Sequence, residues 1–152
     1  MNKAVLAHIL LLLNLALLAG LLLSPAPSGT PVTLEYETIS VPKAGQALID
    51  QKALFIDARS TEAYQEQSIP TAQSWPAGEK PSPQLLEAMR RAEQIVVYCD
   101  GPHCGAGAQV AKDILSMDFD NVVLMEAGIE GWLKAGNPVS RYPSVSGASE
   151  TK

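Results

Sequence analysis

Two cysteines, Cys99 and Cys104, are the residues of this chain whose type and spacing point most directly to chemistry. They lie in one loop, between an apolar, β-branched run at 95–98 and a helical pattern of apolar residues at 110–115. At such a junction a helix N-terminus presents unpaired N–H groups and a partial positive charge. Both features stabilise a thiolate, so we expect Cys99 to be a reactive nucleophile.

The rest of this loop supplies residues that turn the backbone or carry a titratable group. We expect its glycines, including Gly107 at the start of the helix, to let the backbone curl and direct N–H groups toward an anion. His103 titrates near neutrality, so it is either an acid or base beside the sulfur or an exposed loop side chain. The predicted substrate-binding residues of the loop are Asp100, Gly101, Pro102, His103 and Gly105.

The sequence leaves several roles open for the cysteine pair. Cys104 could attack a persulfide on Cys99, which would release sulfide and leave a disulfide. The two thiols could instead form a permanent, inactive disulfide, if the geometry allows it, or Cys99 could be a buried and inert small residue. Cys99, His103 and Cys104 could also bind copper(I) or zinc. No fourth ligand is in sight, so we predict neither a metal nor a cofactor.

Asp57 and Arg59 follow a second apolar run, at 53–56, which we interpret as a buried parallel strand. In parallel sheets, ligands bind at the carboxyl ends of the strands. The two residues are therefore further candidates for the mouth of the substrate site, and a structural ion pair is the alternative. Trp75 and Trp132 are expected to pack in or beside the core.

Strand and helix patterns alternate along the remaining chain, which predicts an α/β domain with a mostly parallel sheet and right-handed crossovers. We expect strands at 32–39, 53–56, near 75, 95–98 and 121–125. We expect helices from 42 to about 51, after 60, after 83, across 110–115 and from 128, the last ending at Gly136.

The N-terminal segment, 1–23, is predicted to be a transmembrane anchor. Residues 4–23 are apolar apart from His8, Asn14 and Gly20, and this length suffices to cross a bilayer. Lys3 precedes the run and acidic residues follow it, which predicts a single pass through the plasma (inner) membrane with the body facing the periplasm or exterior. A cleaved signal peptide is the alternative.

Three further regions follow the anchor: a Pro/Ser linker at 24–33, one domain at 34–141 and a flexible tail at 142–152. The net charge is −5 and the 11 Lys and Arg residues are scattered, so no nucleic-acid partner is expected.

Several short segments, in this order and spacing, resemble the rhodanese-like domain. They are Leu54–Arg59, Ile69–Ala72, Val97–Cys99, Phe119–Val122, Glu126–Ile129 and Ala135–Val139. The resemblance covers about 34–141 and implies a five-stranded, mostly parallel sheet flanked by helices. Among the departures from the common family pattern, Cys104 stands where an arginine is common in the loop, and Thr71 where a glycine is usual. With Cys99 and Cys104, the loop resembles a subset of the family whose loop reads Cys-x4-Cys.

The resemblance implies sulfurtransferase chemistry, in which Cys99 takes a sulfane sulfur, becomes a persulfide and passes the sulfur to a thiol acceptor. The expected partners are a small sulfur-containing anion or persulfide donor, a thiol protein as acceptor, and the membrane. Two alternatives stay open: a thiol-disulfide redox protein using Cys99 and Cys104, and an inactive rhodanese-like binding module.

Overall fold

The computed structural model describes residues 35–142. The predicted anchor, the linker and residues 143–152 of the predicted tail lie outside the described residues. Within the part that is described, no helix has the length and apolar character needed to cross a membrane.

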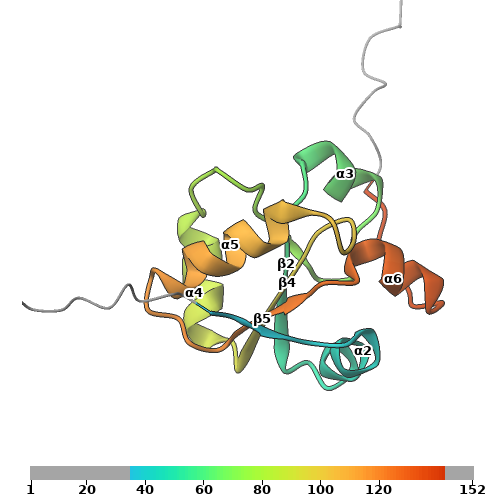
Figure 1. Cartoon of the computed structure of the whole chain (residues 1–152), viewed down its shortest axis with the longest axis horizontal. Helices are drawn as coiled ribbons and strands as arrows, with labels where there is room; N and C mark the ends of the chain where they lie inside the picture. The colour runs from blue at the N-terminus through green and yellow to red at the C-terminus, as the bar shows by residue number, and fades with distance from the viewer. Residues whose placement is uncertain (1–34, 143–152) are drawn as a thin grey trace, which may run out of the picture. The chain divides into compact units, whose positions relative to one another are not determined.

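The centre of the domain is a five-stranded sheet in which every paired strand is parallel (Figure 1). The spatial order is β1-β5-β4-β2-β3. The strands are β1 (Glu37–Thr38), β2 (Ala53–Asp57), β3 (Gln73–Ser74), β4 (Gln94–Tyr98) and β5 (Val122–Met125). The expectation of a mostly parallel α/β sheet is therefore confirmed. Of the first strand expected at 32–39, residues 35–39 are described, and among these only Glu37 and Thr38 pair with β5.

The helices alternate with the strands as the sequence pattern predicted. They are α2 (Val41–Ile49), α3 (Thr61–Glu66), α4 (Pro83–Arg91), α5 (Gly105–Leu115) and α6 (Gly128–Lys134). Two of them begin at serine caps, where Ser60 Oγ accepts a hydrogen bond from Ala63 N (3.3 Å) and Ser82 Oγ accepts one from Leu85 N (3.1 Å). After α6, Gly136 has φ +75°, a left-handed conformation that ends a helix readily.

Helices cover both faces of the sheet, so its central strands are buried on both sides (Figure 1). On one face, Val97 packs with residues of α4 and α5. On the other face, Val96 packs with residues of α2 and α6. Trp75 and Trp132 are 2% and 0% exposed and belong to opposite faces, which confirms their predicted place in the core.

The register of the sheet places three strand ends at one edge. Asp57 at the end of β2 is aligned with Tyr98 at the end of β4, and Tyr98 is aligned with Met125 at the end of β5. The segments that follow these strands therefore leave the sheet side by side, and this edge carries the cysteine loop.

Candidate functional site

The two cysteines form a disulfide across the loop between β4 and α5. Cys99 directly follows β4 and Cys104 is the N-cap residue of α5. Their Cα atoms are 6.1 Å apart, within the usual range for a disulfide. A turn hydrogen bond from Cys104 N to Gly101 O (3.0 Å) folds the loop back and brings the sulfurs together. The geometry that the sequence left open therefore permits the bridge.

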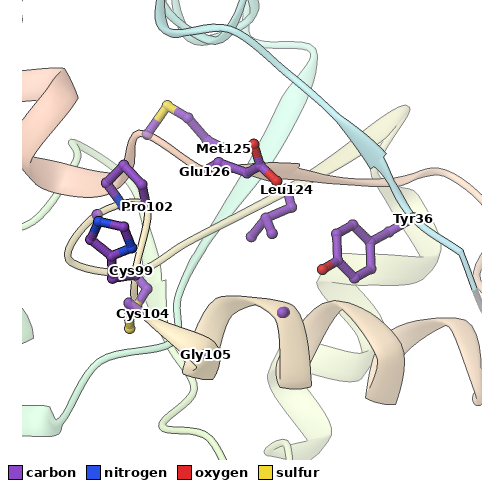
Figure 2. Close-up of a pocket in the computed structure, with 11 residues that line it drawn as sticks. Tyr36, Cys99, Pro102, Cys104, Gly105, Leu124, Met125 and Glu126 are labelled. Carbon is purple, nitrogen blue, oxygen red and sulfur yellow. A yellow bond between two sulfur atoms is a disulfide. The ribbon is translucent and has the colours of Figure 1, made fainter.

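A hollow of about 210 Å³ lies beside this disulfide. Figure 2 shows the loop with Cys99 and Pro102 on one side, Tyr36 on the other and Leu124 between them. Cys99 is 4% exposed and lines this hollow, so the residue is almost fully buried there. The residues that line it are Tyr36, Cys99, Gly101–Gly105, Ala108 and Leu124–Glu126.

A second hollow, of about 330 Å³, lies against the same loop. It shares Gly101, Pro102, His103 and Cys104 with the first hollow and adds Asp100 and Glu130. Cys99 lines only the first hollow, whereas Cys104 lines both. The predicted substrate-binding residues of the loop are thus gathered around the disulfide.

The charge around the disulfide is negative. Asp100, Glu126 and Glu130 line the two hollows, and no Lys or Arg does so among the described residues. Of these three carboxylates, only Asp100 was predicted from the sequence to lie at the site. The other two carboxylates follow β5, and the available signal was the strand order, which places the end of β5 beside the end of β4.

None of the loop glycines Gly101, Gly105 and Gly107 has a left-handed φ. The loop folds back at Gly101 through the turn hydrogen bond from Cys104 N. Two of the three glycines also permit close packing. A Cβ atom at Gly101 would lie 2.8 Å from Glu130 Oε2, and one at Gly107 would lie 2.9 Å from Leu124 Cδ1. Nothing lies within 4 Å of such an atom at Gly105.

The start of α6 holds the cysteine loop in place. Ile129 N donates to Cys99 O (2.8 Å), and Glu130 N donates to Asp100 O (2.9 Å). These bonds require close approach of the two backbones at Gly128, where a Cβ atom would overlap the carbonyls of Cys99 and Asp100. Gly128 also has φ +58°, a conformation that suits glycine. Two otherwise unpaired N–H groups of α6 thus orient the backbone of Cys99 and Asp100.

Asp57 and Arg59 lie beneath the loop and line neither hollow. Arg59 Nη2 donates to Asp57 Oδ2 (2.7 Å) and to Gln67 O (2.6 Å), and both side chains are buried. Burial acts to lower the pKa of Arg59, but the hydrogen bond and charge of Asp57 outweigh it and raise this pKa. Arg59 Nη1 also lies 3.7 Å from Asp100 Oδ1. Asp57 and Arg59 thus form a buried ion pair, and Arg59 also contacts Asp100 of the cysteine loop.

Tyr98 connects the end of β4 to the turn after α3. Its hydroxyl accepts a hydrogen bond from Ile69 N (3.1 Å), and the Arg59 guanidinium lies 6.0 Å from its ring centroid. Burial raises the pKa of Tyr98, so the phenol stays protonated and neutral. The residue before Cys99 is therefore fixed by packing and by one buried hydrogen bond.

The residues that could hold a metal ion are not those expected from the sequence, because Asp100 takes the place of His103. Ligand atoms of Cys99, Asp100 and Cys104 lie within 4.8 Å of one another, and His103 is not part of this group. Because both sulfurs are joined to each other, a metal ion would require prior reduction of the disulfide.

Residues 40–135 match the family model of the rhodanese-like domain. The chain belongs to the rhodanese-like family. The resemblance noted in the sequence is therefore confirmed over most of the described residues. The rhodanese-like loop of this chain carries Cys99 at the end of β4, with a second cysteine at the N-cap of the following helix.

Known proteins similar to this rhodanese-like domain differ in their names. Arsenate reductase 2.2 of Oryza sativa subsp. japonica is 30% identical over 107 residues, which cover 62% of this chain and 79% of that protein. A solved structure of a Bacillus halodurans protein is 30% identical, with a TM-score of 0.61, and the match covers 71% of this chain and 78% of that one. Thiosulfate sulfurtransferase from Pseudomonas aeruginosa is 23% identical with a TM-score of 0.54. That match covers 70% of this chain and 20% of the other, and shows a shared fold alone.

Proposed function

We propose that this protein is a sulfurtransferase that carries a sulfane sulfur on Cys99 and passes it to a thiol acceptor. One observation carries the proposal: in a member of the rhodanese-like family, Cys99 directly follows β4, is almost fully buried and lines a hollow in the loop that leads to the N-terminus of α5. A thiolate at this position is stabilised by the helix dipole and shielded from bulk water. The activity requires the reduced form, in which the Cys99–Cys104 bond is open.

The proposed transfer has two steps. The Cys99 thiolate attacks the sulfane sulfur of a donor, a new S–S bond forms, and the rest of the donor leaves as an anion with the electron pair of the broken bond. An acceptor thiolate then attacks the outer sulfur of the Cys99 persulfide and takes it away, which restores the Cys99 thiolate. N–H groups at the start of α5 stabilise the negative charge in both steps.

The carboxylates around the loop bear on the choice of donor. Asp100, Glu126 and Glu130 oppose the entry of a dianion, and the lining residues offer no Lys or Arg in compensation. We therefore propose that an organic persulfide with a single charge is a better donor than thiosulfate.

Mass spectrometry of the reduced chain tests this function. The chain is treated with thiosulfate or with cysteine persulfide, and the modified peptide is mapped. One added sulfur on Cys99, retained in Cys104→Ser and lost in Cys99→Ser, is the expected result. If a disulfide between Cys99 and Cys104 is the only change that either donor causes, sulfur transfer is contradicted.

A thiol-disulfide redox function is the second candidate, and the disulfide itself favours it. The name of the arsenate reductase relative also fits redox chemistry at a cysteine loop. In this alternative, Cys99 and Cys104 exchange two electrons with a partner and no stable persulfide forms. Equilibration with a glutathione buffer would then give a defined reduction potential, and the persulfide experiment would give no added sulfur.

We also propose that the domain is exported and held at the inner membrane by residues 1–23, for the reasons given by the sequence. Membranes isolated from cells that express the full chain are expected to retain it after alkaline carbonate washing. Release by the wash, with loss of the N-terminal residues from the mature protein, would favour the signal-peptide alternative.

A further inference from the structure

The two sulfurs of the disulfide differ in how an outside thiol can reach them. Cys99 is 4% exposed and lines only the smaller hollow, whereas Cys104 is half-buried and lines both hollows. Thiol-disulfide exchange requires a thiolate to contact the sulfur that it attacks. Access therefore favours attack at Cys104, and this choice makes Cys99 the leaving group.

The shape of the loop suits a thiol that is carried on a protein surface. Gly101, Pro102, His103 and Cys104 line both hollows, so these four residues form a ridge between them. Pro102 and His103 are exposed on this ridge. A groove on a partner protein can enclose such a ridge from two sides, whereas a small thiol would contact one side only.

The charge of the larger hollow adds a further requirement on the partner. Asp100 and Glu130 line it together with Cys104, and the side chain of Asp100 is 62% exposed. Arg59 lies 3.7 Å from Asp100, but its guanidinium is buried and is held more closely by Asp57 (2.7 Å), so the exposed Asp100 carboxylate is only partly compensated. An approaching thiolate is therefore repelled unless positive charges accompany it.

We propose that the disulfide is reopened by a dithiol protein whose reactive cysteine is surrounded by lysine or arginine, and that this cysteine attacks Sγ of Cys104 from the acidic hollow. The proposal rests on the proposed function, because it names the partner that returns Cys99 to its active form. It assigns Cys104 a role as the point of entry for electrons.

The reduction of the Cys99–Cys104 disulfide proceeds in two exchange steps. The partner thiolate forms a bond to Sγ of Cys104, the Cys99–Cys104 bond breaks, and the electron pair leaves on Sγ of Cys99 as a thiolate. The second cysteine of the partner then attacks its own first sulfur, forms the partner's disulfide and releases Cys104 as a thiolate. The partner is oxidised by two electrons and the loop is reduced by two.

The first test locates the mixed disulfide on the oxidised wild-type chain. A synthetic peptide with one cysteine between lysines is added, the reaction is quenched with acid, and free thiols are alkylated before tandem mass spectrometry. The expected product carries the peptide on Cys104 and the alkyl group on Cys99. The reverse distribution would overturn the proposal, and this measurement does not depend on any variant folding.

The second test measures the effect of charge on the rate of reduction. The lysine-flanked peptide is compared with a peptide of the same length that has glutamates in place of the lysines. The double variant Asp100→Asn, Glu130→Gln removes both carboxylates of the larger hollow. For each carboxylate removed, we expect the rate of reduction by the lysine peptide to fall by about 3-fold and the rate of reduction by the glutamate peptide to rise by about 3-fold. Glu126→Gln is the matched control, because Glu126 lines only the other hollow. Equal responses of the two peptides, or a larger effect in the control, would overturn the proposal.

These results are separable from those for sulfur transfer. Reduction is measured without any sulfur donor, and the reduced chain is then given cysteine persulfide. Attack at Cys104 without later persulfide on Cys99 would leave this inference standing and remove the proposed function. Persulfide formation on Cys99 after attack at Cys99 would do the opposite.

Discussion

The ends of β2 and β4 are neighbours in the sheet and carry polar groups of very different character. At the end of β2, Asp57 and Arg59 are buried and satisfy each other with hydrogen bonds. At the end of β4, the loop from Cys99 to Cys104 faces two hollows. Asp100 makes one longer ion contact there, 3.7 Å to Arg59, and the Glu130 carboxylate makes no ion pair among the described residues. Position at a carboxyl edge therefore does not make a residue functional by itself. What matters is whether its polar atoms are already used within the fold.

The largest effect should come from breaking the ion pair at the end of β2. Arg59→Met leaves the buried Asp57 without its cation, and we expect a loss of about 3–5 kcal/mol in the free energy of unfolding. Urea denaturation measures this loss. The double variant Asp57→Asn, Arg59→Met is the control and should recover much of the stability. If the free energy of unfolding of Arg59→Met lies within about 1 kcal/mol of the wild-type value, the ion pair at the end of β2 does not stabilise the fold.

The variant Gly128→Ala should disturb the cysteine loop, because Gly128 packs against the backbone of Cys99 and Asp100. An alanine there must adopt φ +58° and displace the carbonyls of Cys99 and Asp100, so we expect a loss of about 3 kcal/mol in stability and slower reduction of the disulfide. Gly105→Ala is the matched control, since its added methyl group meets no atom within 4 Å. Thermal unfolding of both variants measures the difference, and equal melting temperatures would refute this role of Gly128.

Opening the disulfide should cost less. The bridge closes a short loop, with a sequence separation of 5, and the chain-entropy argument gives about 2 kcal/mol for such a loop. Unfolding in urea with and without dithiothreitol measures it, and Cys104→Ala in the presence of the reductant is the control that should show no further effect. A loss as large as that of Arg59→Met would mean that the β4 end is as structural as the β2 end.

The smallest effect is expected at Tyr98, which joins the two regions. Tyr98→Phe leaves the buried Ile69 N–H unpaired and should cost about 1 kcal/mol. Because burial raises the pKa of Tyr98, this contribution is complete below pH 10 and is lost as the pH rises further, where the unfolded chain releases the proton first. Stability curves from pH 8 to 11 should therefore fall less steeply for Tyr98→Phe. Parallel curves would contradict the assigned pKa direction.

The elements of this fold were largely predictable, because each strand and helix carries a local pattern. Short apolar runs predicted β2 and β4, and the helices expected after 60 and after 83 are α3 and α4. The close packing at Gly101 and Gly107 was not predicted, because a glycine can serve either a turn or close packing and the sequence does not distinguish the two. Glu130 was missed because its distance from Cys104 is set by the packing of α6 and by no local pattern.

The sequence by itself determined the alternation of strands and helices, the family, and the place of Cys99 between a buried strand and a helix. These properties depend on residues that are close in the chain, so periodicity, caps and spacing reveal them. Only the tertiary structure decided that Asp57 and Arg59 neutralise each other under the loop, that Gly128 supports it, and that Glu126 and Glu130 make its surroundings acidic. The physical reason is that charge and close contact act through space, and the order β5-β4-β2 brings together side chains from three distant segments.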